Sequence, residues 1–231
     1  MIINTWHVFD VSPWLIAMLA MALGAALVWL AFDLGMVQIG KWQRSGLLAE
    51  DAFPENKSKP VKRLILVVAG AASGLVLCWI WGPVPAVFPG VVLMGILIAL
   101  AWIDAETGYL PDLLTIPLLW LGLLVNLDET FVRLSEGVLG AVTGYMVFWL
   151  LAWGFRKVTG RDGLGNGDFK LLAAIGAWLG IQMLPQVLLV ASSSALIAVA
   201  IFRLAGLLKA GQSISFGPYL ALGGAVGLIS L

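Results

Sequence analysis

The sequence is organised around one short polar stretch, GNGDFK at residues 165–170, set between two strongly apolar segments. A carboxylate at the edge of a membrane helix is costly, about 2.5–3.5 kcal/mol at the bilayer centre and less towards the interface. Gly165 and Gly167 allow positive φ and a close approach of the backbone to another segment or to a ligand. Because residues 171–179 return at once to apolar sequence, we expect Asp168 to begin a membrane helix, where the helix dipole favours its charge.

The composition is typical of a membrane protein. Of the 231 residues, 61% are hydrophobic and 11% are charged, whereas a soluble domain carries about 25% charged residues. The mean hydropathy is +1.01. A soluble core could not bury so much apolar surface, so the sequence predicts an all-α, polytopic membrane protein in lipid, with one domain over residues 1–231. The formal net charge of zero gives no indication of a nucleic-acid partner.

Apolar runs predict about eight transmembrane helices, separated by proline, glycine and charged residues. The one long polar stretch, residues 40–63, is expected to be a loop. The expected spans are residues 14–35, 64–81, 87–103, 112–125, 137–155, 168–183, 185–203 and 217–231.

Basic residues are distributed very unevenly over the links between these spans. Of the 13 Lys and Arg residues, only Arg133 lies in a link after an even-numbered span. Because an excess of positive charge marks the cytoplasmic side, the links after the odd-numbered spans are expected there, including residues 40–63. Asp104 ends the third span and Asp168 follows the link after the fifth. We therefore expect both carboxylates at the cytoplasmic face.

Two aspartates within hydrogen-bond reach cannot easily both ionise, so one takes a proton and the other stays charged. The charged one can activate water while the neutral one polarises a carbonyl or protonates a leaving nitrogen. This chemistry makes Asp104 and Asp168 a candidate aspartic-protease pair. A single cysteine, Cys78, and a single histidine, His7, exclude a metal site built from those residues and a Ser-His-Asp triad. A Ser-Lys dyad stays open.

Further positions are candidates for supporting the site or binding substrate. Asp112 is interpreted mainly as the N-cap of the fourth span, with a site role as the alternative. Lys170 is expected to extend to the interface or to lipid phosphates, with tuning of the site as the alternative. Gly217 and Pro218 predict the start of the eighth helix, and the alternative is a break that exposes backbone to a peptide strand.

Three separated blocks of sequence carry a family resemblance. They are AWID (101–104) with LPD (110–112), LT (114–115), PLLWLGL (117–123) and Asn126; GNGDFKLLAA (165–174) with GAWLG (176–180) and LP (184–185); and FGPYLA (216–221). In this order the blocks resemble type IV prepilin peptidases, which are membrane aspartic endopeptidases of the Gly-x-Gly-Asp type. The match runs from about residue 93 to the end. It implies a peptidase core over residues 87–231, with Asp104 and Asp168 as the catalytic pair.

The resemblance also implies a substrate and a place of action. Members of this family cut the basic leader from prepilins or pseudopilins of type IV pili and type II secretion, on the cytoplasmic side of the bacterial inner membrane. Many also methylate the new N-terminus with S-adenosylmethionine, and carry two Cys-x-x-Cys pairs and a Gly-Ser-Phe-Leu-Asn stretch. This chain lacks both motifs, which argues against methylation here. Proteolysis is expected to need no cofactor and no metal.

Three alternative interpretations stand beside this one. A proton-coupled transporter would use the aspartates as carriers, but it predicts polar residues through the depth of several spans, and those are nearly absent. A non-catalytic assembly factor would need a disabled pair, and both aspartates are present. A peptidase of the same fold with a non-pilin substrate differs only in its partner protein.

Overall fold

The computed structural model describes residues 12–45, 60–160, 165–208 and 214–231. These residues form eight α-helices and two short 3-10 helices, and no strand occurs among them. The helices are α1 (Pro13–Arg44), α2 (Pro60–Trp81), α3 (Val87–Thr107), α4 (Asp112–Val125), η1 (Asn126–Asp128), α5 (Leu134–Thr159), α6 (Asn166–Leu179), η2 (Ile181–Met183), α7 (Leu184–Leu204) and α8 (Gly217–Ile229). The expected all-α membrane class is confirmed.

Five segments are long and apolar enough to cross a bilayer: α1, α2, α3, α5 and the combined η2–α7 segment. The remaining helices, α4, α6 and α8, have 14, 14 and 13 residues. At 1.5 Å per residue these are about 20 Å long, shorter than the roughly 30 Å hydrocarbon layer. The eight helices lie at the positions where eight spans were expected. That all eight cross the membrane completely stays a prediction.

Several expected boundaries were wrong. α1 continues to Arg44, about nine residues past its expected end, so residues 40–44 of the expected loop are helical. Lys41 and Arg44 stand in its last turn, where the negative end of the dipole favours basic side chains. α6 stops at Leu179 because Gly180 takes a φ of 77°. Residues 60–63 of the same expected loop begin α2, and α5 runs past both ends of the expected span 137–155. Residues 46–59, 161–164 and 209–213 lie outside the described part of the chain.

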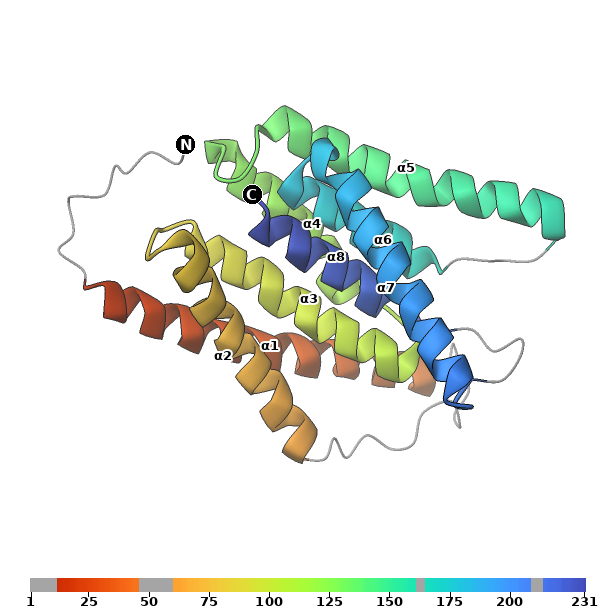
Figure 1. The fold of residues 1–231 in the computed structure, drawn as a ribbon, viewed down its shortest axis with the longest axis horizontal. Coiled ribbons are helices and arrows are strands. Elements are labelled where there is room, and N and C mark those ends of the chain that lie inside the picture. Colours follow the sequence, from red (N-terminus) through yellow and green to blue (C-terminus); the bar gives the residue numbers. More distant parts are fainter. Residues whose placement is uncertain (1–11, 46–59, 161–164, 209–213) are drawn as a thin grey trace.

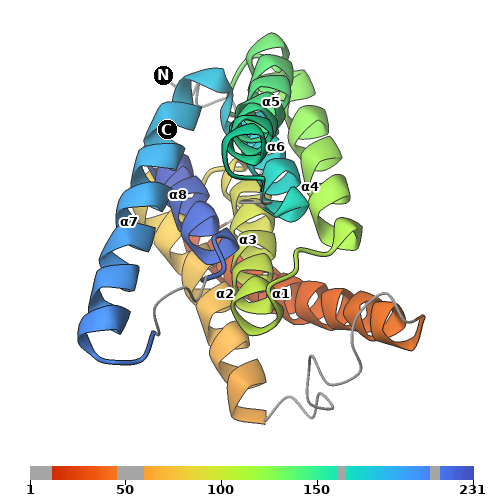
Figure 2. The ribbon, with the colours of Figure 1, turned by 90° about the vertical axis from the view of Figure 1, so that its right-hand side faces the viewer.

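The helices form two groups joined by α8. α3 packs against α1 and α2, and α6 packs against α4 and α5. α8 lies between α3 and α6, and α7 covers its outer side (Figures 1 and 2). α3 and α6 are therefore the central helices, and 11 of the 14 residues of α6 are buried.

Glycine allows the closest helix contacts. Gly24 of α1 lies against the backbone of Gly70 of α2, and Gly140 of α5 lies against the backbone of Gly176 of α6. A Cβ at any of these positions would overlap the facing helix, so glycine is what permits this close packing of helices.

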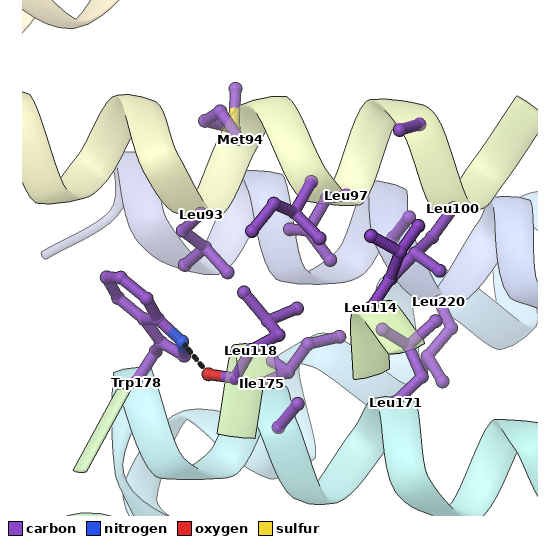
Figure 3. Packing of buried hydrophobic residues seen from close by; sticks show 14 of the residues in the cluster. Leu93, Met94, Leu97, Leu100, Leu114, Leu118, Leu171, Ile175, Trp178 and Leu220 are labelled. Atoms are coloured by element: carbon purple, nitrogen blue, oxygen red, sulfur yellow. Dashed lines mark hydrogen bonds between the residues drawn. The ribbon is translucent and has the colours of Figure 1, made fainter. Parts of the chain in front are cut away.

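The core between the two groups is apolar and contains few polar side chains. Leu93, Leu97 and Leu100 of α3 face Leu118 of α4 and Ile175 of α6 (Figure 3). The buried Trp178 satisfies its indole N–H by donating to the carbonyl oxygen of Leu118 at 2.8 Å. The outward faces remain apolar as well, with Leu189 of α7 70% exposed, as expected of helices that face lipid.

This packing brings distant parts of the chain to one end of the bundle. α3 ends there, whereas α6 and α8 begin there (Figure 1). The residues at these three helix ends form the candidate site.

Candidate active site

Asp104 lies in the last turn of α3 and is 4% exposed. Its Oδ2 accepts a hydrogen bond of 2.9 Å from the backbone N–H of Gly217, at the first residue of α8. Four residues later, Gly108 ends α3 with a left-handed φ of 68° and donates its N–H to the Asp104 carbonyl oxygen. Asp104 is thus held by its own helix and by the start of another.

Asp168 lies in the first turn of α6 and is 8% exposed. The N-cap is Gly165, and its backbone forms a hydrogen bond with the Asp168 carboxylate. A side chain that reaches back from the third helical residue to the N-cap backbone is one half of a capping box. The expected position of Asp168 at a helix start is confirmed.

The two carboxylates come from positions 104 and 168, far apart along the chain, and both are buried in the bundle. They lie near enough that the charge on Asp104 acts on Asp168. Both face the beginning of a helix, since Asp168 belongs to the first turn of α6 and Asp104 receives the first N–H of α8. The positive ends of two helix dipoles therefore point at the pair and favour negative charge there.

The glycines before Asp168 act differently from one another. Neither Gly165 nor Gly167 has positive φ, so that expected reason for them was wrong. A Cβ on Gly167 would lie 2.8 Å from the Cβ of Leu110, whereas a Cβ on Gly165 would make an ordinary contact of 3.4 Å with Asp168 Oδ2. Close approach to the link between α3 and α4 therefore explains Gly167, and space alone does not explain Gly165.

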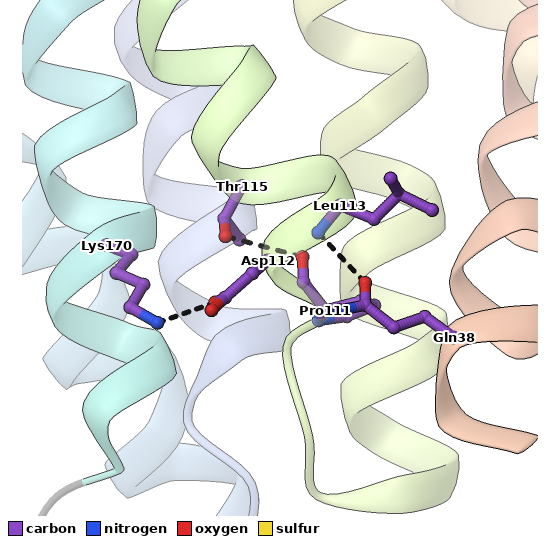
Figure 4. A network of polar contacts seen from close by, with 6 residues as sticks. All are labelled: Gln38, Pro111, Asp112, Leu113, Thr115 and Lys170. Carbon is purple, nitrogen blue, oxygen red and sulfur yellow. Dashed lines mark hydrogen bonds and ion pairs between the residues drawn. The ribbon is translucent and has the colours of Figure 1, made fainter. Parts of the chain in front are cut away.

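The expected N-cap role of Asp112 was wrong. Pro111 has extended backbone angles and is the N-cap of α4, so Asp112 is the first helical residue and not the cap. Its Oδ1 instead accepts a bond of 2.6 Å from Lys170 Nζ, two residues after Asp168 (Figure 4). Lys170 thus joins α6 to α4 beside the candidate site.

One neighbour of the site gave no signal in the sequence. The Gln38 side chain, in the part of α1 that was expected to be past the span, accepts a hydrogen bond of 2.9 Å from the Leu113 N–H (Figure 4). This bond ties α1 to the start of α4. Gln38 could not be singled out because it stood near the edge of a presumed loop.

Gly217 and Pro218 begin α8, as expected. Proline suits the first turn of a helix, because its fixed φ fits and its missing N–H would have no partner inside the helix. Gly217 has no room for a side chain, since a Cβ there would lie 2.5 Å from Asp104 Oδ2. The backbone N–H of Gly217 donates a hydrogen bond to Asp104. Exposure of this backbone to a peptide strand stays a prediction.

A profile described as the type IV leader peptidase family matches residues 91–202, which contain both carboxylates. Residues 91–202 of this chain are thus similar to the type IV leader peptidase family. No solved structure matches the chain significantly.

Curated proteins named prepilin leader peptidase/N-methyltransferase are similar to the chain. The one from Dickeya chrysanthemi is 51% identical over 150 residues, which is 65% of this chain and 53% of the relative. The one from Pectobacterium carotovorum subsp. carotovorum is 47% identical over 172 residues, 74% and 60% of the two chains. The one from Neisseria gonorrhoeae is 47% identical over 161 residues, 70% and 54%. The chain spans 53–60% of the length of these three relatives.

The family match and the site overlap only in part. The profile ends at residue 202, before α8 begins at Gly217. The N–H that holds Asp104 therefore comes from outside the region that matches the leader peptidase family. Among the described residues, no group of three or more His, Cys, Asp or Glu side chains could hold a metal ion.

Proposed function

We propose that this chain is a membrane-embedded aspartic endopeptidase that removes the leader peptide from type IV prepilins or pseudopilins. Asp104 and Asp168 are its catalytic pair. The observation that carries the proposal is the burial of these two carboxylates near each other, where the end of α3 meets the starts of α6 and α8. The names of the relatives supply the substrate class.

The reaction follows from two carboxyl groups that share one proton. The ionised carboxylate takes a proton from a water molecule, whose oxygen attacks the carbonyl carbon of the scissile peptide bond. The protonated carboxyl group donates a hydrogen bond to the carbonyl oxygen and then gives its proton to the leaving nitrogen as the C–N bond breaks. The N–H groups of Gly165 and Gly217 hold the two carboxylates in place during these transfers.

The distribution of buried charge favours this reaction over proton-coupled transport. Asp104 and Asp168 are the only ionisable side chains in the buried class among the residues that the structure describes. A transport path needs polar or ionisable groups at several depths, whereas both of these carboxylates lie at one end of the bundle. The geometry thus supports one local reaction centre.

The decisive experiment replaces each aspartate separately. Asp104→Asn and Asp168→Asn are expected to abolish leader cleavage when purified variants are mixed with a prepilin in membranes or detergent. Asp128→Asn is the matched control, because Asp128 lies in η1 at the other end of α4 and is exposed. Full cleavage by either of the first two variants would remove the proposed mechanism.

We also propose that the pair faces the cytoplasm of a bacterial inner membrane. The last turns of α1, α5 and α7 carry Lys41 and Arg44, Arg156 and Lys157, and Arg203, and these odd-numbered helices share the direction of α3 (Figure 1). The positive-inside rule then places the end of α3, with Asp104, on the cytoplasmic side. Lipid surrounds the apolar outer faces.

Single cysteines test this orientation. In a cysteine-free background, a cysteine at Lys157 is expected to react with an impermeant maleimide only after the cells are opened. A cysteine at Glu129, before α5, is expected to react in cells whose outer membrane alone is permeable. The reverse labelling pattern would contradict the proposed orientation.

The methyl transfer named for the relatives is a separate reaction, and its donor would be S-adenosylmethionine. We propose that leader cleavage by this chain proceeds without it. The mass of the mature pilin after incubation with and without S-adenosylmethionine checks both points: cleavage is expected in both samples, and a gain of one methyl group would reveal the second activity. A non-pilin substrate becomes the better reading if prepilins stay uncut while another membrane protein is cleaved.

A further inference from the structure

Four aromatic residues gather behind the candidate site, and we call Tyr145, Phe148, Phe169 and Phe216 the aromatic cluster. Phe148 of α5 lies at its centre and is 4% exposed. The Phe148 ring centroid is 6.3 Å from that of Phe169 and 6.0 Å from that of Phe216. The Tyr145 ring meets Phe169 edge-on at 6.0 Å. All three distances are within the range of favourable aromatic pairs.

The two partners of Phe148 are the chain neighbours of the site. Phe169 directly follows Asp168, and Phe216 directly precedes Gly217. The N–H of Gly217 belongs to the peptide group that joins it to Phe216, and this N–H is the donor to Asp104. One ring therefore touches both the segment that carries one carboxylate and the segment that holds the other.

The position of Phe148 on α5 explains how one ring reaches both segments. The buried residues of α5 are Gly137, Gly140, Gly144 and Phe148, which share one face. Gly144 packs against the backbone of α6, where a Cβ would lie 2.7 Å from the Leu172 carbonyl oxygen. The face changes from glycine to a large ring where α6 begins, and α5 has no buried residue beyond it.

The ring also joins two helices that are otherwise apart. α5 packs along α6 and not along α8. The contact between Phe148 and Phe216 therefore connects α5 to the start of α8. Without a ring at position 148, the first turn of α8 can shift relative to α6, and Gly217 shifts with it.

We infer that Phe148 is a positioning residue of the proposed peptidase: through Phe169 and Phe216 it fixes Asp168 and the Gly217 N–H relative to each other. This inference rests on the proposed function for its effect on catalysis. Its effect on the geometry is independent of that function. Phe148 touches neither the scissile bond nor the carboxylates in this scheme.

The test uses Phe148→Leu with a matched control at the other end of the bundle. Phe131 likewise bridges two rings, with centroids 5.8 Å from Trp81 and 6.1 Å from Trp178. Phe131→Leu therefore removes a similar pair of contacts far from the aspartates. Both variants are expected to lower Tm, so Tm does not distinguish positioning from ordinary packing.

Two readouts do distinguish them. Phe148→Leu is expected to lower kcat about 10- to 100-fold with KM changed little, because misplacement by about 1 Å costs on the order of 100-fold. Phe131→Leu is expected to leave the kcat of the folded protein within about twofold. Hydrogen exchange of the Gly217 amide is expected to speed up in Phe148→Leu and to stay slow in Phe131→Leu, because the amide loses its acceptor only in the first.

A second variant covers the case in which Phe148→Leu does not fold. Phe216→Leu removes one of the same contacts from the other side, and by itself it is expected to lower kcat and to speed up hydrogen exchange of the Gly217 amide. Where Phe148→Leu folds, the double variant is expected to lower kcat by less than the product of the single effects. Unchanged Gly217 exchange and an unchanged kcat in the folded variants would overturn the inference. An inactive wild type, or an active Asp104→Asn, would instead overturn the proposed function, while Gly217 exchange would still decide the role of Phe148.

Discussion

Gly217→Ala is a sharp test of how Asp104 is held. The added Cβ would lie 2.5 Å from Asp104 Oδ2, whereas ordinary contacts begin at 3.4 Å, so the carboxylate must retreat by about 0.9 Å. The hydrogen bond from the Gly217 N–H, now 2.9 Å, then stretches beyond the usual limit of about 3.2 Å. A misplacement of this size costs on the order of 100-fold in kcat, or about 2.7 kcal/mol of transition-state stabilisation.

Stability is expected to respond far less than activity. Gly217 does not have positive φ, so its backbone accepts alanine without strain. Alanine in a helix is about 0.5–1 kcal/mol more favourable than glycine, which partly offsets the weakened hydrogen bond to Asp104. Tm should therefore change by only a few degrees, whereas kcat should fall on the order of 100-fold.

The assay compares initial rates of prepilin cleavage by equal amounts of folded enzyme at saturating substrate. Gly154→Ala is the control, because a Cβ on Gly154 of α5 meets nothing within 4 Å. It should keep wild-type kcat. Wild-type cleavage by Gly217→Ala, in a background where Asp104→Asn is inactive, would refute the reasoning that the start of α8 fixes Asp104.

Three further predictions concern the surroundings of the pair. Gly167→Ala should destabilise the protein by about 1–3 kcal/mol through overpacking against the link between α3 and α4, and Gly165→Ala should destabilise it by less. A larger loss of Tm in Gly165→Ala than in Gly167→Ala would contradict the contacts at these two glycines. Lys170→Glu should lower cleavage at least about tenfold by repelling Asp112, and adding Asp112→Lys should restore most of the cleavage. Because both side chains are partly exposed, the free energy of unfolding should change by about 1 kcal/mol or less. No recovery of cleavage in the double variant would argue against a functional Lys170–Asp112 ion pair. Asn126→Ala should lower the free energy of unfolding by at least about 2 kcal/mol in denaturation experiments. The buried Asn126 amide forms hydrogen bonds with two carbonyls at the end of α6 and with two N–H groups before α5. A loss below about 0.5 kcal/mol would show that water replaces those hydrogen bonds.

The sequence by itself determined the class of the protein and the order of its helices. Long apolar runs interrupted by glycine, proline and charge depend only on neighbours along the chain, so they predicted eight helices at nearly the right places. The same local logic placed Asp168 at a helix start and Gly217 at another. The three sequence blocks also indicated the family that residues 91–202 match.

Local sequence patterns were least informative where a residue contacts a partner that is distant in the sequence and not its chain neighbours. Asp112 next to a proline suggested an N-cap, yet it pairs with Lys170, 58 residues away. The GxG stretch suggested positive φ, yet Gly167 is needed because Leu110 approaches from another segment. Phe148 looked like any apolar residue of a long helix.

Only the tertiary structure decided which ends meet. The hydrogen bond from Gly217 to Asp104 spans 113 positions, and no periodicity or local preference encodes such a pair. It exists because α8 is packed between α3 and α6, so that the end of one helix and the starts of two others converge. The sequence provides two acids. The packing of three helices, closely fitted through glycine and phenylalanine, places them near each other at one end of the bundle.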